Sequence, residues 1–300
     1  MSNTLQEMSN GLASVVETVG PGIVRVEGRR RMPASGIVWS EDGLIVSANH
    51  VVKRDEGIKI GLADGSVVSA KLVGRDTTTD LALLQSDAKL SKPNWAGADA
   101  DTLGVGHIAL ALGRPGKTVQ ATMGVISALS EGNWRTPAGG MLDRYLQTDV
   151  VMYPGFSGGP LADVNGQVLG LNSSSLMRGV SLAAPTATIN RVAATLAAHG
   201  HIKRGYIGVS TQPVRIPDTL KEEAGQETGL LLVAVDEAGP AGEGALVLGD
   251  TIIGMDDTAV HSYEDLVTLL TGDRIGQEAS FRIIRGGQIQ ESSLTIGSKK

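Results

Sequence analysis

Short apolar stretches separated by turns recur along the first two thirds of the chain, and they constrain its fold more than any other feature. One set of predicted strands comprises 23–26, 36–39, 44–47, 58–62, 67–73 and 81–85, and a second comprises 108–112, 120–129, 144–148, 160–163, 168–172 and 180–184. Ala63-Asp64-Gly65-Ser66 is a predicted hairpin turn, because Asp-Gly supplies left-handed backbone angles. Since almost no helix separates these strands, the chain is expected to be mainly β, with two antiparallel barrels.

Helical spacing marks the two ends of this region. Apolar residues at 5, 8, 12, 15, 16 and 19 predict an amphipathic helix that ends at Gly20-Pro21. A second helix is predicted over 186–198, with Gly200 as its cap and 199–204 as a linker. The last hundred residues hold predicted strands at 230–235, 251–255 and 280–285. They also hold a helix that starts at the capping-box sequence Ser262-Tyr263-Glu264-Asp265 and reaches about Leu270.

The stretch Gly155-Phe156-Ser157-Gly158-Gly159-Pro160-Leu161 combines a hydroxyl with a run of glycines. An acyl-transfer serine needs an uncrowded Oγ and backbone N–H groups aimed at the developing oxyanion. Glycine permits that close approach because it has no Cβ. On its own, the same stretch is also typical of a plain glycine-rich turn.

A base and a carboxylate lie upstream in matching contexts. His50 follows the apolar run 44–46, where a strand gives way to a helical turn, and Asp80 stands at the start of the strand 81–85. His, Asp, Ser is the chymotrypsin-like order of a catalytic triad. Asp76 competes with Asp80 but sits in a turn, and Asp149 is interpreted as a structural residue that holds the nearby loop.

The segments around His50, Asp80 and Ser157 resemble the HtrA (Deg) family of trypsin-like serine proteases. The resemblance continues through Ala184-Pro185 and the segment Arg204-Gly205-Tyr206-Ile207-Gly208-Val209, and it covers nearly the whole chain. It implies a chymotrypsin-like double β-barrel over residues 1–203, followed by one PDZ domain over 204–300. The family usually has Asn before the nucleophile, where this chain has Phe156, which leaves open whether the oxyanion loop is formed at rest.

The resemblance implies a serine endopeptidase that degrades unfolded or damaged proteins through an acyl-enzyme, as in protein quality control and the stress response. Ser157 would attack, His50 would take its proton and Asp80 would hold the imidazole tautomer. The backbone N–H groups of Gly155 and Ser157 would bind the oxyanion. No cofactor is expected.

Substrate preference is predicted from the residue six positions before the nucleophile, which forms the floor of the primary pocket in this fold. That residue is Val151, and Ser173, Ser174 and Leu176 are expected to form a pocket wall. An apolar floor offers no partner for Lys or Arg. Cleavage is therefore expected after small or medium aliphatic residues.

A PDZ domain binds an extended peptide C-terminus as an added strand. By the resemblance, the peptide carboxylate would lie on the backbone N–H groups of Ile207, Gly208 and Val209, beside Tyr206. Leu266 and Leu270 would line the helix side of the site. The alternative is a domain that packs for stability only.

Composition limits the partners and the compartment. The net charge of −6 argues against a nucleic-acid partner, and Arg29-Arg30-Arg31 is interpreted as a solvated loop. No stretch reaches the roughly 18 apolar residues of a membrane span. The first ten residues do not resemble a signal peptide, so a cytoplasmic protein is expected, or a periplasmic one if a leader has been removed. The chain has no cysteine.

Three weaker patterns are set aside. Residues 113–118 contain Gly-Lys-Thr but have Ala111 where a phosphate loop needs glycine, and they are interpreted as a surface loop. Gly104-Val105-Gly106 lacks the strand–helix unit of a dinucleotide site. The histidines are scattered, so no metal site is predicted.

Two expectations remain open. A catalytically silent peptide-binding or chaperone-like module is the alternative function, with Phe156 as its only support. A homotrimer is implied by the resemblance alone, because the aromatic residues that relatives use near the N-terminus are missing here.

Overall fold

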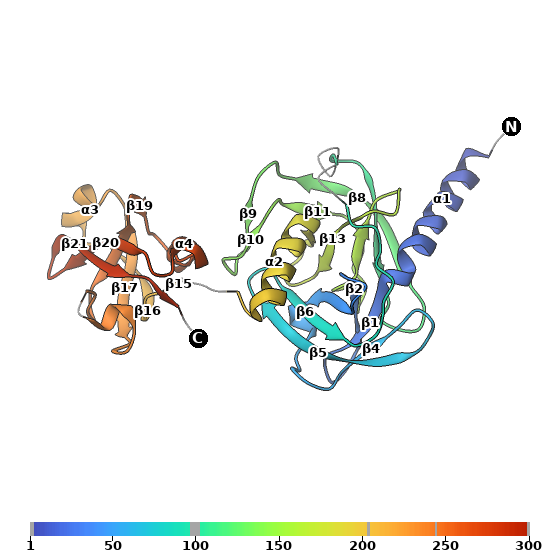
Figure 1. Ribbon diagram of the computed structural model, residues 1–300. Helices are drawn as coiled ribbons and strands as arrows, with labels where there is room; N and C mark the ends of the chain where they lie inside the picture. Colours follow the sequence, from blue (N-terminus) through green and yellow to red (C-terminus); the bar gives the residue numbers. More distant parts are fainter. Residues whose placement is uncertain (1–2, 97–102, 203–204, 244, 299–300) are drawn as a thin grey trace. The chain divides into compact units, whose positions relative to one another are not determined.

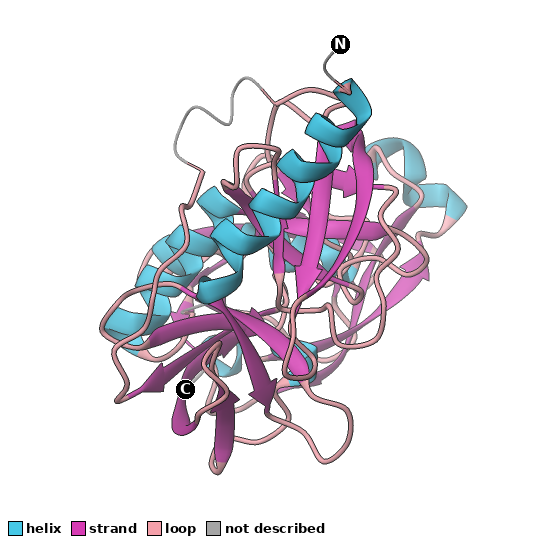
Figure 2. Ribbon diagram, turned by 90° about the vertical axis from the view of Figure 1, so that its right-hand side faces the viewer, coloured by secondary structure: helices cyan, strands magenta, loops and turns pink. Residues whose placement is uncertain are grey.

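The structure is a computed structural model that describes residues 3–96, 103–202, 205–243 and 245–298. It divides into two compact units, Met1–Ile202 and Lys203–Lys300. Strands predominate over helices in both units (Figures 1 and 2). The predicted boundary between residues 203 and 204 lies outside the described residues.

The first unit consists of two closed six-stranded barrels, as predicted. The first barrel has the strand order β1-β2-β3-β6-β5-β4, with β1 (Ile23–Glu27), β2 (Ala34–Val38), β3 (Leu44–Ala48), β4 (Ile58–Gly61), β5 (Val67–Asp76) and β6 (Leu81–Ser86). The second has the order β11-β14-β13-β12-β7-β8, with β7 (Ile108–Gly113), β8 (Gln120–Leu129), β11 (Leu146–Thr148), β12 (Pro160–Ala162), β13 (Val168–Ser173) and β14 (Ser181–Pro185). All neighbouring strands are antiparallel, and most predicted strands differ from the observed ones only at their ends.

Short elements complete this unit. They are the 3-10 turns η1 (Gly20–Gly22) and η2 (Asn49–Val51) and the small hairpin β9 (Trp134–Arg135) and β10 (Met141–Leu142). The predicted strand over 144–148 starts only at Leu146, because residues 143–144 form a bend after β10.

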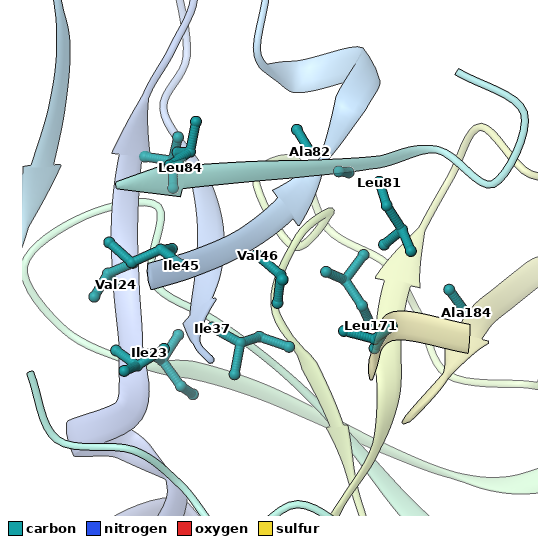
Figure 3. Packing of buried hydrophobic residues seen from close by; sticks show 14 of the residues in the cluster. Ile23, Val24, Ile37, Ile45, Val46, Leu81, Ala82, Leu84, Leu171 and Ala184 are labelled. Carbon is teal, nitrogen blue, oxygen red and sulfur yellow. The ribbon is translucent and has the colours of Figure 1, made fainter. Parts of the chain in front are cut away.

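Aliphatic side chains fill the barrel core, as the low aromatic content of 3% requires. Ile23, Ile37, Ile45 and Leu84 are fully buried, and Leu171 of the second barrel belongs to the same cluster (Figure 3). Fully burying one such side chain contributes about 1.5–3 kcal/mol. The core of the first barrel therefore extends onto the second barrel, which also holds a separate buried cluster of its own.

Two helices flank the barrels, both close to their predicted limits. Helix α1 (Thr4–Val19) ends where Pro21 enters the next turn, and helix α2 (Thr186–His199) is capped by Gly200 at φ +73°. Val15 and Val19 are buried, whereas Leu5 is 79% exposed, so α1 packs only through its C-terminal half and otherwise projects from the barrel (Figure 1).

The second unit is built on a sheet of order β16-β17-β18-β20-β21, with β19 paired to β18 and with the small pair β15–β22. Its elements are β15 (Gly205–Tyr206), β16 (Val209–Arg215), α3 (Asp218–Ala224), β17 (Thr228–Val235), η4 (Pro240–Glu243), β18 (Thr251–Met255), β19 (Thr258–Ala259), α4 (Tyr263–Leu269), η5 (Gly272–Arg274), β20 (Glu278–Arg285), β21 (Gln288–Thr295) and β22 (Gly297–Ser298).

The capping box predicted for α4 is present. The Ser262 side chain accepts from the Asp265 backbone N–H, and the Asp265 side chain accepts from that of Ser262. Strands β16 and β21 and helix α3 were not among the predicted elements. Both strands lie at sheet edges and expose many polar side chains, which removes the apolar alternation that marks a strand.

In the part of the chain that the structure describes, no helix combines the length and apolarity needed to cross a membrane.

Candidate active site

His50 and Asp80 meet because their strands are neighbours. His50 lies in η2 directly after β3, and Asp80 directly precedes β6, whose Leu81 pairs with Ala48 at the end of β3. His50 Nδ1 is 2.7 Å from Asp80 Oδ2, and the His50 backbone N–H donates to Asp80 Oδ1 at 2.9 Å. Asp80 is buried, and its carboxylate holds both the ring and the backbone of His50. This is the geometry that holds one tautomer, with Nε2 free to accept a proton.

Asp76 has a different set of partners. Its buried carboxylate accepts from the backbone N–H of Thr78 at 3.0 Å, from the hydroxyl of Thr78 at 2.7 Å and from the hydroxyl of Thr79 at 2.8 Å. Asp80 therefore stands beside the imidazole, and Asp76 organises the turn that precedes it. Asp149 accepts from the backbone N–H of Val125 at 2.6 Å, which agrees with its interpretation as a loop-holding residue.

Ser157 lies at the same end of the second barrel as Ser174. Strands β12 and β13 are antiparallel, so the residues before β12 and after β13 come together. Ser157 Oγ is 3.1 Å from Ser174 Oγ, and the Ser174 backbone N–H also points to it at 3.4 Å. Within the described ranges, Ser157 makes no hydrogen bond to His50. In this arrangement the side-chain partner of the Ser157 hydroxyl is Ser174.

The loop Gly155–Gly159, which we call the nucleophile loop, presents two backbone donors. Gly155 and Gly158 have φ values of +93° and +89°, which favour glycine strongly. Phe156 N–H donates to Tyr153 O, and Gly158 N–H donates to Asn172 O. The N–H groups of Gly155 and Ser157 have no hydrogen-bond partner among the residues described here. These two are therefore available to a ligand oxygen, as an oxyanion hole requires.

Phe156 anchors the nucleophile loop instead of disturbing it. Its side chain is fully buried in a cluster of the second barrel with Leu161 and Leu169. Its ring also meets Tyr153 edge to face, with centroids 5.9 Å apart. A Cβ added to Gly113 would lie 3.0 Å from this ring, so a side chain at that position would crowd it. The large apolar residue is a core side chain, and the loop around it has a defined shape.

The four residues expected at the specificity pocket, Val151 as its floor and the other three as its wall, have different surroundings. The Ser173 hydroxyl is fully buried and donates to Asp80 Oδ2, so Ser173 belongs with the triad acid. Ser174 contacts Ser157, Leu176 is buried in the core cluster of the barrels, and Val151 is 56% exposed. The run of three serines at 173–175 gave no sign of which one faces Asp80, because that choice depends on how the two barrels pack.

A second candidate site lies in the second unit, between β16 and α4. A groove of about 280 Å³, which we call the α4 groove, is lined by Gly205, Tyr206, Ile207, Gly208, Val209, Thr211, Tyr263, Leu266, Val267 and Leu270. All six residues expected at a PDZ peptide site line this groove. The Tyr206 hydroxyl donates to Asp236 at 2.7 Å, and this hydrogen bond raises the pKa of Tyr206 above its ordinary value.

Backbone geometry at the closed end of the α4 groove leaves donors free. The carbonyls of Ile207 and Gly208 accept from Ala241 N–H at 2.9 Å and from Asp236 N–H at 2.7 Å. Gly208 has a φ of +80°. For the described part of the chain, the N–H groups of Ile207 and Gly208 have no acceptor. Consecutive free N–H groups of this kind form an anion-binding concavity.

One of the patterns set aside from the sequence includes a buried cation. Arg114, in the 113–118 segment, is buried rather than on a surface loop, and its guanidinium donates to three backbone carbonyls. Burial lowers the pKa of Arg114. No group of three or more His, Asp or Glu side chains among the described residues is arranged to hold a metal ion.

Comparison with known proteins agrees with this geometry. Residues 34–171 match the family model of a trypsin-like peptidase domain, and residues 205–296 match that of a PDZ domain. The solved structure of the HtrA-type protease AlgW with a tripeptide is 30% identical, covers 96% of this chain and 97% of its own, and superposes with a TM-score of 0.70. The chain belongs to the HtrA family of trypsin-like serine proteases.

Two curated relatives carry the name "probable periplasmic serine endoprotease DegP-like". The one from Halomonas elongata is 35% identical over 285 residues and the one from Pseudomonas putida is 37% identical over 272 residues, which is 92% and 88% of this chain. The matches cover 59% and 56% of those relatives. The chain thus spans somewhat more than half the length of these curated HtrA relatives.

Proposed function

We propose that this HtrA-family protein is a serine endopeptidase that cleaves peptide bonds in unfolded or damaged proteins. The observation that carries the proposal is the His50–Asp80 pair at 2.7 Å on the same unit as a nucleophile loop with two unpartnered N–H groups among the described residues. A chain that had the fold but not the chemistry would need neither feature. The names of the relatives and of the solved HtrA structures support the same activity.

In this mechanism, Ser157 Oγ turns from Ser174 and attacks the scissile carbonyl carbon while His50 Nε2 takes its proton. Asp80 holds the tautomer and stabilises the imidazolium, with the Ser173 hydroxyl as its second support. The N–H groups of Gly155 and Ser157 stabilise the oxyanion. His50 then gives its proton to the leaving amine, and water hydrolyses the acyl-enzyme by the reverse roles.

For substrate choice, we propose cleavage after small or medium aliphatic residues. Val151 offers no charged group for Lys or Arg in the primary pocket. Its exposed side chain is compatible with contact to substrate. Paired peptides with Val or Arg at the cleaved position measure this preference, and faster cleavage after Arg would contradict it.

The α4 groove is proposed to bind peptide C-termini. Its free N–H groups suit a carboxylate, its wall of Leu266 and Leu270 suits an apolar terminal side chain, and β16 is an open sheet edge for an added strand. The HtrA-type protease AlgW has been solved with a tripeptide, which supports peptide binding. Residues 1–203 would then be the protease domain and residues 204–300 the peptide-binding domain.

The compartment and the assembly are proposed from the family. The relatives' names support the periplasm, the second of the two compartments expected from the sequence. The homotrimer rests on the resemblance alone.

The decisive experiment is digestion of casein by the wild-type chain and by Ser157→Ala, with Ser175→Ala as a control that removes a neighbouring exposed hydroxyl. Loss of a triad serine typically lowers kcat by about 10⁶-fold, so S157A is expected to fall to background and S175A to retain activity. Equal activity of wild type and S157A would reject Ser157 as the nucleophile.

A wild type that binds C-terminal peptides but hydrolyses nothing would favour the silent peptide-binding module. The specific observation on its side is the contact of Ser157 with Ser174 instead of His50.

A further inference from the structure

Ser35 occupies an unusual position for a residue outside the triad. It lies on β2 of the first barrel, is fully buried, and uses its N–H, its hydroxyl and its carbonyl in contacts with other segments. Its carbonyl accepts from the Ser47 hydroxyl at 2.8 Å. Its other two groups hold the nucleophile loop of the second barrel.

Two of these contacts reach the carbonyls of the proposed oxyanion donors. The Ser35 hydroxyl donates to Gly155 O at 2.7 Å, and the Ser35 N–H donates to Ser157 O at 3.2 Å. Gly155 and Ser157 are the residues whose own N–H groups have no partner within the described chain. Ser35 thus holds each donor residue by its carbonyl and leaves the donor itself free.

The hydroxyl of Ser35 is itself held in direction. It accepts from the Arg114 backbone N–H at 2.8 Å, so its single proton has to point to Gly155. Arg114 is fixed in turn, since its guanidinium donates to Gly20 O at 2.9 Å and to Ile23 O at 2.7 Å. The N-terminal segment therefore anchors the residue that orients the Ser35 hydroxyl.

Neighbouring segments pack closely against the glycines of the nucleophile loop. A Cβ added to Gly158 would lie 2.1 Å from Ser35 O, and one added to Gly155 would lie 2.5 Å from Pro115 Cβ. The loop passes between β2 on one side and the end of β7 on the other. The Gly155 carbonyl belongs to the peptide bond with Phe156, so the Ser35 hydroxyl opposes rotation of that peptide and fixes the backbone directly after the Gly155 N–H.

We propose that Ser35 is a positioning residue of the oxyanion hole, which orients the N–H groups of Gly155 and Ser157 by holding their carbonyls. The inference rests on the proposed protease function. Ser35 touches neither substrate nor the reacting atoms, and it acts through the backbone of the nucleophile loop. Its loss leaves a buried carbonyl and a buried N–H without partners.

The test compares Ser35→Ala and Ser35→Cys with Ser86→Ala, in the full chain. Ser86 is also a buried serine of the first barrel, and its hydroxyl accepts from Ala88 N–H away from the site. Deleting an oxyanion donor costs about 10²–10³-fold in kcat. Loosening the donors through S35A is therefore expected to lower kcat roughly 10- to 100-fold. KM should stay near the wild-type value, S35C should be intermediate, and S86A should match wild type.

A second readout does not depend on turnover. The amide ¹H–¹⁵N resonances of Gly155 and Ser157 are expected to shift in S35A and not in S86A. A folded S35A with wild-type kcat and unshifted resonances overturns the inference. If wild type is inert but the two resonances shift, the protease function fails and the positioning role stands. If S35A does not fold, S35C with wild-type kcat and unshifted resonances overturns it.

Discussion

The nucleophile loop and the end of the α4 groove at Ile207 and Gly208 share one backbone arrangement. Each has a glycine at a φ near +90° or +80°, two N–H groups without partners among the described residues, and carbonyls tied to neighbouring chain. They differ in what ties those carbonyls and in what lies beside the donors. In the nucleophile loop, the carbonyls accept from the buried hydroxyl and the N–H of Ser35. In the α4 groove, the carbonyls of Ile207 and Gly208 accept from backbone N–H groups alone.

The neighbours decide the chemistry. Beside Gly155 stands a hydroxyl that can be deprotonated, with His50 and Asp80 on the facing barrel. The α4 groove at Gly208 is lined by Leu266 and Leu270, and its described lining includes no histidine to activate a hydroxyl. With the proposed function, an anion-binding backbone would serve catalysis in one unit and recognition in the other. Substitutions at each site test this comparison.

The largest effect is expected from adding a Cβ to each glycine. Gly155→Ala should lower casein hydrolysis by at least about 10²-fold, because the donor would be displaced. Its Cβ would lie 2.5 Å from Pro115 Cβ, and alanine would also be strained at a φ of +93°.

Gly208→Ala should weaken binding of a C-terminal peptide about 10-fold, because its Cβ would lie only 3.1 Å from Gly239 Cα.

Gly65→Ala is the matched control for both glycine variants, since its φ is +86° but nothing lies within 4 Å of the added Cβ. It should cost about 1–2 kcal/mol of stability and leave both hydrolysis and peptide binding unchanged. Hydrolysis assays, fluorescence polarisation and thermal unfolding separate these effects. Equal losses of hydrolysis in G155A and G65A would mean that backbone strain, not donor position, is responsible.

A smaller effect is expected when the C-terminal carboxylate of a peptide that binds the α4 groove is replaced by an amide. A peptide with a free C-terminal carboxylate should bind about 10- to 100-fold more tightly than the same peptide with a C-terminal amide, because hydrogen bonds to a charged group contribute about 1.5–3 kcal/mol. Isothermal titration of the two peptides measures this difference. Equal affinity would show that the N–H groups of Ile207 and Gly208 do not receive the carboxylate.

The smallest effect is expected from removing the hydrogen bond between the Ser157 and Ser174 hydroxyls. Ser174→Ala removes the side-chain hydrogen bond that Ser157 Oγ makes in place of one to His50. A net hydrogen bond contributes about 0.5–1.5 kcal/mol, so labelling of Ser157 by a fluorophosphonate should become roughly 2- to 10-fold faster. Ser175→Ala should label at the wild-type rate. Slower labelling of S174A would mean that Ser174 helps the attack rather than delaying it.

Much of this architecture could be predicted from local signals. Alternating apolar runs located the strands of both barrels, Pro21 and Gly200 marked the ends of two helices, and the capping box marked the start of α4. The order of His50, Asp80 and Ser157, together with their local sequence contexts, indicated the candidate site. These features depend on residues close in sequence, and short-range backbone preferences and hydrophobic periodicity are sufficient to determine them.

Local signals could not predict the edge strands or the residues that each serine of the site contacts. Strand β16 lacks an apolar alternation because most of its residues are polar or proline and four of its seven residues are exposed. Whether Asp80 or Asp76 meets His50, and whether Ser173 or Ser174 faces Asp80, depends on contacts between distant segments. Ser173 and Asp80, for example, lie on different barrels and are separated by 93 positions. No periodicity within either segment carries that information.

The sequence by itself determined that this chain forms two barrels and a further sheet domain, and which side chains can do chemistry. Only the tertiary structure decided that Phe156 is a core anchor, that Ser157 rests against Ser174, and that Ser35 holds the nucleophile loop. The physical reason is that hydrogen bonds and close packing act over a few ångströms in space. Folding brings Ser35 and Gly155 together across 120 positions.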